Sequence, residues 1–486
     1  MSDRPRSRSS ALAGIPAGPR ATRRGNEPSP VRAGGARNPG GTVRVLPSTV
    51  RVGLLGLGTV GAGVCEVLQR NRADIERKVG RGIDIARVLV RDPSKVRPVD
   101  LPPERITVDP EDILGDPDLR IVVELMGGTD PARDYILRAL RSGKSVVTAN
   151  KDIMAEHGGE VWAAAAAGGA DVFFEASVGG GIPIVRAMKE SLAGNSVRRV
   201  AGILNGTTNY ILTRMSRDGL PLPEALAEAQ AQGYAEADPS ADLDGLDAAR
   251  KLCILSSIAY STRCRPADVF RQGIRDIGPA DIAYGARMGW TCKLLGISEL
   301  RDGRVSMRVH PAFVRREHPL AAVTEAFNAI YIQGDAIGEA MFYGRGAGSL
   351  PTASAVLGDL MDAARFIDRG GSGTACTCFH RRPIEHIGSV VSRFYIRLQV
   401  DDRVGVLAQI AGVFGRCEVS ILSVLQSPLA SGAAAAGGSG EGERAELIVV
   451  THEVREDRLE RAIAGLRRLP SIRGVGAVIR LAPEDL

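Results

Sequence analysis

Residues 50–70 read VRVGLLGLGTVGAGVCEVLQR, an apolar segment that passes through a glycine-rich turn into a helical pattern. Gly56, Gly58 and Gly61 give the pattern G-x-G-x-x-G between the predicted strand and helix. The first glycine makes the tight turn, the second lets the backbone approach a pyrophosphate, and the third lets helix and strand pack closely. The stretch therefore predicts a dinucleotide-binding turn whose helix-start amides face the phosphates. A glycine-rich turn that binds no nucleotide is the alternative.

Strand and helix patterns alternate after this turn. Strands are predicted at 83–90, 120–126, 145–150 and 171–178, and helices at 130–140 and 160–167. Alternation of this kind is typical of a parallel, doubly wound sheet. We therefore predict an α/β protein whose NAD(P)-binding Rossmann domain spans 49–193 and includes a returning segment at 340–370.

The pattern changes from Gly194 onward. A carboxylate-rich helix is followed by alternating apolar strands, for example at 305–314 and 329–336. Mixed patterns of this kind indicate an α+β domain. We predict that residues 194–370 form a substrate-binding, catalytic and dimerisation domain, separated from the Rossmann domain by a cleft.

A third pattern follows a predicted linker at 371–390. Residues 391–484 show the order βαββαβ, which predicts a small ferredoxin-like domain. The low-complexity insert SGAAAAGGSGEGE, residues 431–443, falls between two strands that are expected to pair. We expect this insert to form an exposed hairpin loop.

Charge is distributed unevenly along the 486-residue chain, whose net charge is +6. Residues 1–48 hold nine arginines against Asp3 and Glu27, so the remaining chain carries −1. We expect this Arg-, Gly- and Pro-rich extension to be disordered, with a transit peptide as the alternative. A nearly neutral folded part predicts no nucleic-acid partner. Since no apolar run reaches the roughly 18 residues needed to span a bilayer, we also expect no membrane association.

The seven cysteines are scattered and no secretory signal precedes them, which favours a reduced, cytoplasmic setting. The stretch CTCFH, residues 376–380, is similar to a metal-binding tract. Its cysteines are closer together than in the usual zinc sites, and no second pair follows. We therefore predict no zinc site there.

The end of the second predicted strand bears on the choice of cofactor. An acidic residue at this position would bond the ribose 2′-OH of NAD. The sequence instead places Arg91 there, with Asp92 behind it and Lys95 nearby. Because a guanidinium suits a 2′-phosphate, we predict NADP, while use of NAD stays open. The alternative is that these residues form a solvated turn.

Six motifs in this order resemble homoserine dehydrogenase over roughly residues 49–370. They are GLGTVG (56–61), TANK (148–151), EASVGGGIPI (175–184), NGTTNYIL (205–212), GYAEADPSADLDGLDAARK (233–251) and GRGAG (344–348). The resemblance implies an NAD(P)-dependent oxidoreductase that interconverts L-homoserine and L-aspartate 4-semialdehyde, in threonine, methionine and isoleucine biosynthesis. Since only residues 1–48 precede the nucleotide fold, we expect a monofunctional enzyme without an aspartate kinase segment.

The segment 233–251 gathers five carboxylates ahead of one lysine. Pro239 suits a helix start, which places Asp247 and Lys251 one turn apart on one face; a surface ion pair is the alternative. By resemblance, Lys251 is the proton donor and acceptor, and Asp247 orients the reacting group or its water. Lys151 ends a predicted Rossmann strand, at the edge where such sheets bind ligands. By resemblance it also lies at the substrate and the nicotinamide, where it brings a second ammonium to the same oxygen; an exposed loop residue is the alternative.

The resemblance assigns further residues to the substrate and the cofactor. Substrate binding is assigned to Glu236, Asp242, Asn205 and Thr207, whereas Asp238 and Asp244 are expected to be solvated. Cofactor contacts are assigned to Gly56, Gly58, Thr59, Val60, Gly61, Arg91, Lys95, Thr129, Thr148, Lys151 and Gly344.

The resemblance also implies a monovalent cation, with Na⁺ expected. Its ligands are the side chain of Glu175 and the main-chain carbonyls of Val178, Gly180 and Ile182. Oxygen ligands suit a hard cation, and the glycines of this segment allow the carbonyls to converge. A simple chain turn is the alternative.

The stretch DDRVGVLAQIAGVF, residues 401–414, resembles the strand-to-helix turn of an ACT domain. Such domains commonly bind an amino acid between copies, which implies threonine as an effector. Val404 stands where proline is usual, so a purely dimerising module stays open. In either case we expect a homodimer or a higher homo-oligomer.

Two other functions are kept as alternatives. One is another Rossmann dehydrogenase that acts on a different amino or hydroxy acid. The other is a catalytically silent amino-acid sensor, although Lys151, Asp247 and Lys251 together argue against it.

Overall fold

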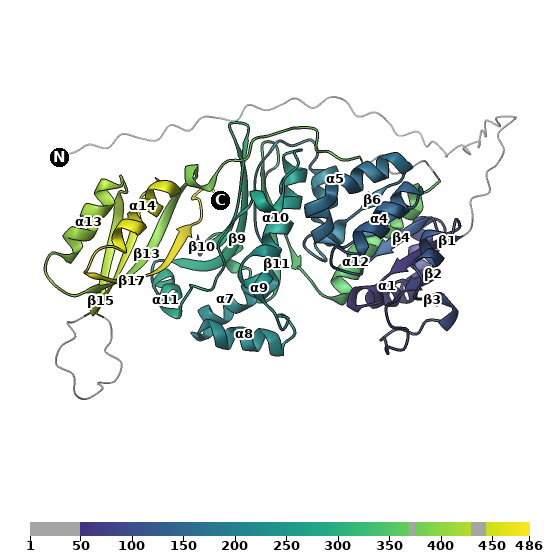
Figure 1. Cartoon of the computed structure of the whole chain (residues 1–486), viewed down its shortest axis with the longest axis horizontal. Helices are drawn as coiled ribbons and strands as arrows, with labels where there is room; N and C mark the ends of the chain where they lie inside the picture. Colours follow the sequence, from purple (N-terminus) through teal and green to yellow (C-terminus); the bar gives the residue numbers. More distant parts are fainter. Residues whose placement is uncertain (1–48, 369–374, 429–443) are drawn as a thin grey trace, which may run out of the picture. The chain divides into compact units, whose positions relative to one another are not determined.

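The computed structural model describes residues 49–368, 375–428 and 444–486 (Figure 1). The N-terminal extension 1–48, the first part of the predicted linker, 371–374, and the insert 431–443 lie outside the described residues. What was predicted for these segments stays a prediction.

The nucleotide-binding part contains one sheet of six parallel strands in the order β3-β2-β1-β4-β5-β6. The strands are β1 (Thr49–Leu55), β2 (Gly82–Leu89), β3 (Ile106–Thr107), β4 (Ile121–Glu124), β5 (Ser145–Thr148) and β6 (Val172–Phe173). This order starts in the middle of the sheet and winds to each edge in turn, as a doubly wound fold does. The predicted parallel Rossmann sheet is confirmed.

Helices pack on both faces of this sheet (Figure 1). One face carries α1 (Thr59–Arg70), α2 (Arg72–Val79) and α12 (Ser349–Phe366). The other carries α3 (Glu111–Leu114), α4 (Ala132–Arg141) and α5 (Lys151–Gly168). The helix α12 comes from far along the chain, and it buries Val356 and Leu360 beside Val64 and Leu68 of α1. Of the segment predicted to return at 340–370, α12 packs in the core of the Rossmann part, whereas residues 340–345 belong to β12 of the second sheet.

The strand predicted at 171–178 is much shorter in the structure. It ends after Phe173 in β6, and a single 3₁₀ turn follows at Glu175–Ser177. The cause is the buried carboxylate of Glu175, which accepts hydrogen bonds from the amides of Val185 and Arg186 at 2.8 Å each. These bonds turn the chain toward α6 (Ile184–Arg186) instead of extending the sheet.

A second, mixed sheet begins at β7 (Val197–Ile203). Its antiparallel part has the order β12-β11-β7-β9-β10, with β9 (Trp290–Arg301), β10 (Arg304–Arg315), β11 (Phe327–Gly334) and β12 (Gly338–Arg345). Its helices are α7 (Gly206–Asp218), α8 (Leu222–Ala231), α9 (Ser240–Leu243), α10 (Leu246–Ala259) and α11 (Pro279–Arg287). The short strand β8 (Phe270–Arg271) pairs with β10. The predicted second domain of mixed α and β structure is confirmed.

The C-terminal residues form β13 (Val391–Asp401), α13 (Val406–Arg416), β14 (Ile421–Pro428), β15 (Arg444–Thr451), β16 (Val454–Arg455), α14 (Glu456–Leu466) and β17 (Ile472–Leu481). The strand order β17-β13-β15-β14 is antiparallel throughout, and both helices contribute to a separate apolar core. This sheet continues the second one, because Arg480 and Leu481 of β17 pair in parallel with Ala312 and Phe313 of β10.

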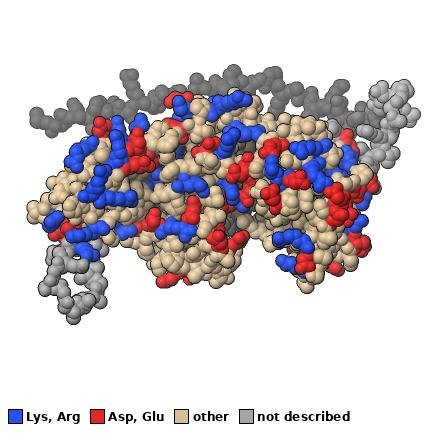
Figure 2. Space-filling view, viewed as in Figure 1, with Lys and Arg blue, Asp and Glu red and all other residues tan. Residues whose placement is uncertain are grey.

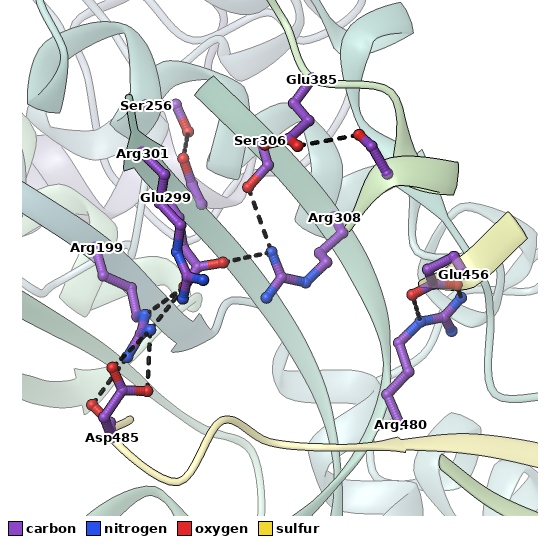
Figure 3. A network of polar contacts seen from close by, with 12 residues as sticks. Arg199, Ser256, Glu299, Arg301, Ser306, Arg308, Glu385, Glu456, Arg480 and Asp485 are labelled. Atoms are coloured by element: carbon purple, nitrogen blue, oxygen red, sulfur yellow. Dashed lines mark hydrogen bonds and ion pairs between the residues drawn. The ribbon is translucent and has the colours of Figure 1, made fainter. Parts of the chain in front are cut away.

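A buried charge cluster lies near this junction (Figure 3). Glu299 on β9 pairs with Arg199 of β7 at 2.7 Å and with Arg308 of β10 at 2.9 Å. Arg199 also binds Asp485 near the C-terminus at 3.1 Å. The arginines lower the pKa of the Glu299 carboxyl to about 2, against burial, which alone would raise it. Glu299 is therefore held as an anion inside the sheet domain.

Acidic and basic side chains are interspersed over the face of the molecule that Figure 2 shows. That face carries no broad patch of one sign, which fits the nearly neutral charge beyond residue 48. Within the described part of the chain, no helix is both long enough and apolar enough to cross a membrane.

Candidate active site

Two lysines from different parts of the fold meet at one carboxylate. Lys251 Nζ lies 2.7 Å from Asp247 Oδ2, and Lys151 Nζ lies 3.6 Å from Asp247 Oδ1. Lys151 begins α5 in the Rossmann part, whereas Asp247 and Lys251 lie one turn apart on α10. Leu204 also accepts a hydrogen bond from Lys251 Nζ, at 2.9 Å, through its main-chain carbonyl. The three residues predicted to be catalytic are thus brought together.

The helix that carries Asp247 and Lys251 starts later than predicted. Pro239 is the residue before α9, as expected, but α9 ends at Leu243 and α10 begins at Leu246. Gly245 between them has φ +77, a left-handed conformation that glycine adopts without strain. The break lets α9 and α10 take different directions, so Asp242 and Asp247 reach one site from two helices.

Asp247 is kept charged by its neighbours. Burial would raise the pKa of this carboxyl, but the ammonium groups of Lys251 and Lys151 outweigh that effect and lower it below the usual value. The side chain of Asp247 is only 13% exposed. The site therefore holds a fixed negative charge flanked by two cations.

Asn205 connects the acidic residues. It caps the N-terminus of α7, because its Oδ1 accepts a hydrogen bond from the Thr208 amide at 2.8 Å. Its Nδ2 donates to Asp242 Oδ1 at 2.7 Å and to Asp247 Oδ2 at 2.9 Å. Burial raises the pKa of Asp242, with Asn205 lowering it and Asp247 raising it further. A bound cationic group would stabilise the charged form of Asp242.

These residues line a cavity of about 770 Å³. The predicted residues in its wall are Lys151, Asn205, Thr207, Glu236, Asp238, Asp242, Asp247 and Lys251. Glu236 is exposed, and Thr207 Oγ1 donates to the carbonyl of Tyr234 at 2.6 Å. Asp244, in contrast, is half exposed and pairs with Arg275 at 2.5 Å outside the cavity wall. Asp238 and Asp244 were both expected to be solvated; Asp244 lies outside the cavity wall, whereas Asp238 is exposed but also lines the cavity.

A second cavity, of about 710 Å³, lies at the carboxyl ends of β1, β2 and β4. Gly56 and Gly58 line it, and Gly56 has φ +99. A Cβ at Gly56 would lie 2.7 Å from the Leu125 carbonyl oxygen, and one at Gly61 would lie 2.3 Å from the Gly56 oxygen. A Cβ at Gly58 would meet nothing within 4 Å, so the backbone there is open to a ligand. This geometry fits a nicotinamide dinucleotide, as the sequence pattern predicts.

Basic residues surround one end of this cavity. Arg91, Lys95 and Arg97 line it together with Asp92. The Asp92 carboxylate is occupied by the Ser94 hydroxyl at 2.6 Å and the Ser94 amide at 2.9 Å, which lower its pKa. Arg97, which sequence reasoning missed, binds the carbonyls of Asp92 and Lys95 and so shapes this turn.

The remaining predicted cofactor residues lie less directly at this cavity. Thr59 and Val60 start α1, directly after the glycine turn. Thr129 precedes Asp130 and Pro131, which line the cavity, but Thr129 itself does not. Gly344 lies on β12 beside Arg345, outside the walls of both cavities.

Thr148 has a structural role in this arrangement. It is fully buried, and its hydroxyl donates to Glu124 Oε2 at 2.7 Å and accepts from the Asn150 amide at 3.0 Å. Asn150 in turn caps α5, accepting from the Ile153 amide at 3.2 Å. These bonds fix the chain directly before Lys151, so Thr148 positions the lysine through the main chain.

The segment assigned to a cation forms a tight loop. Gly179 and Gly180 have φ +73 and +55, and Val178, Gly180 and Ile182 are buried. Burial raises the pKa of Glu175, although two amide donors stabilise its charge. The described residues contain no group of three or more His, Cys, Asp or Glu side chains suited to a metal ion. Donors here would be one carboxylate and main-chain carbonyls, a set that suits only a weakly bound hard cation.

The loop that leads into α12 is the main part of the 770 Å³ cavity that sequence reasoning did not assign. Residues 345–351 line this cavity, and Ser349 Oγ donates to the Thr59 carbonyl at 2.7 Å. The loop therefore connects the cavity that holds the two lysines to the glycine turn. The sequence signal was its glycine content, GRGAG, directly before a predicted helix.

Comparisons with known proteins identify the family. Residues 56–175 match the family model "Homoserine dehydrogenase, NAD binding domain", and residues 183–361 match "Homoserine dehydrogenase". A homoserine dehydrogenase from Synechocystis is 44% identical over 89% of this chain and 99% of its own length.

Solved structures of similar fold support the same family. A homoserine dehydrogenase from Thiobacillus denitrificans has a TM-score of 0.81 at 38% identity, covering 89% of this chain and 98% of its own. A hyperthermophilic archaeal homoserine dehydrogenase mutant, in complex with NADPH, has a TM-score of 0.55 at 28% identity, covering 65% of this chain and 97% of its own. The glycine cradle, the paired lysines and these likenesses agree, and the chain belongs to the homoserine dehydrogenase family.

Proposed function

We propose that the chain interconverts L-homoserine and L-aspartate 4-semialdehyde with a nicotinamide cofactor, using Lys151 and Lys251 at the reacting oxygen. The observation that carries this proposal is the convergence of both lysines on Asp247 inside one cavity. In this reaction the nicotinamide ring supplies or accepts the hydride.

The acidic wall of the cavity fits the ammonium end of the substrate. Asp242 is a half-buried carboxyl with a raised pKa, and Glu236 lies in the same wall. Placing an ammonium between them stabilises two negative charges that are otherwise only partly paired. Asn205 and Thr207 add polar contacts from the start of α7.

The lysines act at the other end of the substrate. In the reductive direction, the Lys251 ammonium gives a proton from Nζ to the carbonyl oxygen as that oxygen gains negative charge. Lys151 adds a second positive charge near this oxygen, and Asp247 holds both ammonium groups in place. In the oxidative direction the same atoms return the proton.

Assay of the full chain with aspartate semialdehyde tests the proposal. We expect NADPH consumption that depends on the semialdehyde and is strongly reduced in Lys151→Met. Consumption only with another oxo acid would instead indicate a different Rossmann dehydrogenase. No consumption with any oxo acid, despite cofactor binding, would indicate a sensor.

We further infer a preference for NADP, supported by the three cations at the end of the nucleotide cavity. Replacing both Arg91 and Lys95 with alanine is expected to raise KM for NADPH roughly 10- to 100-fold, because hydrogen bonds to charged groups contribute about 1.5–3 kcal/mol. KM for NADH should change little. Side-by-side titrations of NADPH and NADH measure this.

The matched control for this change is Arg70→Ala. Arg70 is an exposed arginine at the end of α1 that pairs with Glu66 at 3.4 Å and lies outside the wall of the nucleotide cavity. An equal rise in KM for both cofactors in the double variant would contradict a contact with the 2′-phosphate.

A monovalent cation, Na⁺, is proposed at Glu175 and the carbonyls of Val178, Gly180 and Ile182. The support is chemical: the Glu175 carboxylate is buried beside a glycine-rich loop whose main-chain carbonyls are further oxygen donors. Such a cation would fix the loop between the two cavities. Titrating activity with NaCl against choline chloride tests this, and identical curves would remove the cation.

For the C-terminal residues 391–484 we propose an ACT domain that binds threonine. The support is the strand order β17-β13-β15-β14 and the exposed turn at Val404, where Gly405 has φ +89. Leu407 and Val424 expose apolar surface on this module, which suits pairing with a second copy. Calorimetric titration with threonine distinguishes an effector site from a purely dimerising module.

We place the enzyme in the cytoplasm, as a homodimer or higher homo-oligomer of the threonine, methionine and isoleucine route. Met341 and Tyr343 are exposed on the edge strand β12, an apolar edge that a second copy would cover. Light scattering on the purified chain measures the oligomer, and a monomer at micromolar concentration would contradict it.

The domain boundaries 49–193, 194–370 and 391–484 remain part of this proposal.

A further inference from the structure

A third cavity, of about 450 Å³, lies away from the substrate and nucleotide sites. Its walls are α5, α10 and residues 376–378 of the segment after α12. Lys189 lies on one wall, with its Nζ 4.7 Å from the ring centre of Trp162 and 5.5 Å from that of Phe174. Arg263 lines another wall. Glu156 and Glu160 of α5 also line it, so the wall is partly apolar and carries charges of both signs.

Two half-buried thiols face this cavity. Cys376 Sγ is 3.8 Å from Arg263 Nη2, and Cys378 Sγ is 3.9 Å from the Ser257 carbonyl oxygen. One residue, Thr377, separates the two cysteines, and both line the same cavity. They therefore form a thiol pair beside a guanidinium.

The segment that carries the pair is held firmly to the end of α10. The His380 amide donates to the Ser261 carbonyl at 2.8 Å, and the Thr262 hydroxyl donates to the His380 carbonyl at 3.1 Å. The Arg382 amide also donates to the Thr262 hydroxyl, at 3.1 Å. These bonds fix the chain on one side of the two cysteines, so the pair has a defined place over the cavity.

The electrostatics of the pair differ from those of the buried cysteines. The Cys378 thiol hydrogen-bonds to Cys376, and with Arg263 it lowers the pKa of Cys376 despite partial burial. The pKa of Cys378 is raised by the same contact. In contrast, burial raises the pKa of Cys65 to about 11 and those of Cys264 and Cys292 to about 12. Cys376 therefore combines a lowered pKa with a neighbouring guanidinium and a neighbouring thiol, the setting that favours a reactive cysteine.

We propose that Cys376 and Cys378 are a redox-active thiol pair, which small hydroperoxides oxidise to a disulfide at this cavity. The Cys376 thiolate attacks the peroxide oxygen and becomes a sulfenic acid while the O–O bond breaks, and the leaving oxygen takes a proton from the solvent and departs as water or an alcohol. The Cys378 thiol then attacks the sulfenic sulfur, an S–S bond forms and water leaves. The dithiol loses two electrons and the peroxide gains them.

This inference does not rest on the proposed function. Treating the full chain with equimolar hydrogen peroxide, alkylating the remaining thiols with iodoacetamide and digesting with trypsin tests it by mass spectrometry. Both cysteines fall in one tryptic peptide, GGSGTACTCFHR, residues 370–381. We expect this peptide to lose two hydrogens and to resist alkylation, while Cys417, a half-buried cysteine without a thiol neighbour in sequence, remains alkylated.

Two variants fix the order of the steps. In Cys378→Ser the reaction should stop at the sulfenic acid, which dimedone traps on Cys376. In Cys376→Ser neither a disulfide nor a dimedone adduct on Cys378 should form. At pH about 6, alkylation of Cys376 in the untreated wild-type chain should be at least tenfold faster than that of Cys417, since the thiolate is the reacting form.

The measurements on the wild-type chain do not depend on whether the variants fold. The proposal is overturned if Cys376 and Cys378 remain fully alkylated after peroxide, or if Cys417 is oxidised at the same rate. A dimedone adduct on Cys378 in the Cys376→Ser variant, at the rate seen for Cys376, would also overturn it.

Discussion

Replacing Lys251 with methionine is expected to lower kcat for reduction of aspartate semialdehyde by about 10²- to 10⁴-fold, the usual contribution of a positioned general acid. Methionine keeps most of the apolar stem of the side chain but removes the ammonium that lies 2.7 Å from Asp247. KM for NADPH should change little, because Lys251 does not line the nucleotide cavity. Steady-state kinetics, with the concentrations of both substrates varied, measure kcat and KM for NADPH separately.

A second variant distinguishes charge from proton transfer. Lys251→Arg keeps a positive charge near Asp247, but a guanidinium stays protonated and is a poor proton donor. We therefore expect low kcat in this variant too. Lys78→Met, at an exposed position on α2, is the control for loss of a lysine. If kcat in Lys251→Met stays within about twofold of wild type, Lys251 is not the proton donor.

Replacing Glu299 with glutamine is expected to lower the free energy of unfolding by about 3–5 kcal/mol, because it removes the buried anion that two buried arginines share. Arg199 and Arg308 are 5% and 3% exposed, and both contact the Glu299 carboxylate (Figure 3). Asp485, the other carboxylate bound to Arg199, is 75% exposed and therefore replaces this charge poorly. Urea unfolding followed by circular dichroism measures the loss.

The same residue predicts how stability depends on pH. Its folded pKa is lowered from 4.5 to about 2, so its stabilising contribution is complete above the unfolded value and is lost as pH falls toward the folded value. The difference in stability between wild type and Glu299→Gln should therefore be largest near neutral pH and shrink from about pH 4.5 downward.

Glu325→Gln is the matched control for this change. Glu325 pairs with Arg217 at 2.7 Å, but the two side chains are 36% and 53% exposed. Such exposed pairs contribute only about 0–1 kcal/mol. Equal destabilisation in the two variants, or a wild-type advantage that does not change with pH, would contradict the role given to Glu299.

Much of the nucleotide-binding fold follows from local sequence. The glycine turn and the alternating apolar segments predict parallel strands, and the structure confirms them. The strand predicted at 171–178 shows the limit, since its end is set by hydrogen bonds that the amides of Val185 and Arg186, ten and eleven residues away, donate to Glu175. The pattern of apolar residues does not predict that contact.

The candidate active site, like the fold, could be predicted from the sequence only in part. The spacing of Asp247 and Lys251 predicts that they share a helix face, and they do. The approach of Lys151 needs the two domains to pack against each other, and only the family resemblance suggested it. The bridge made by Asn205 joins residues 37 and 42 positions away. The Glu299 cluster was not predicted at all, because its charges come from three separate strands that read as ordinary alternation.

The central claim is that two ammonium groups, one from each side of the cavity, meet at the oxygen bonded to the carbon that is oxidised or reduced. A crystal structure of the chain with NADP⁺ and L-homoserine bound tests it most directly. The account predicts Lys151 Nζ and Lys251 Nζ both within about 3 Å of the homoserine hydroxyl oxygen, with Asp247 contacting both. A complex in which either lysine points into solvent, while another side chain contacts that oxygen, would contradict it.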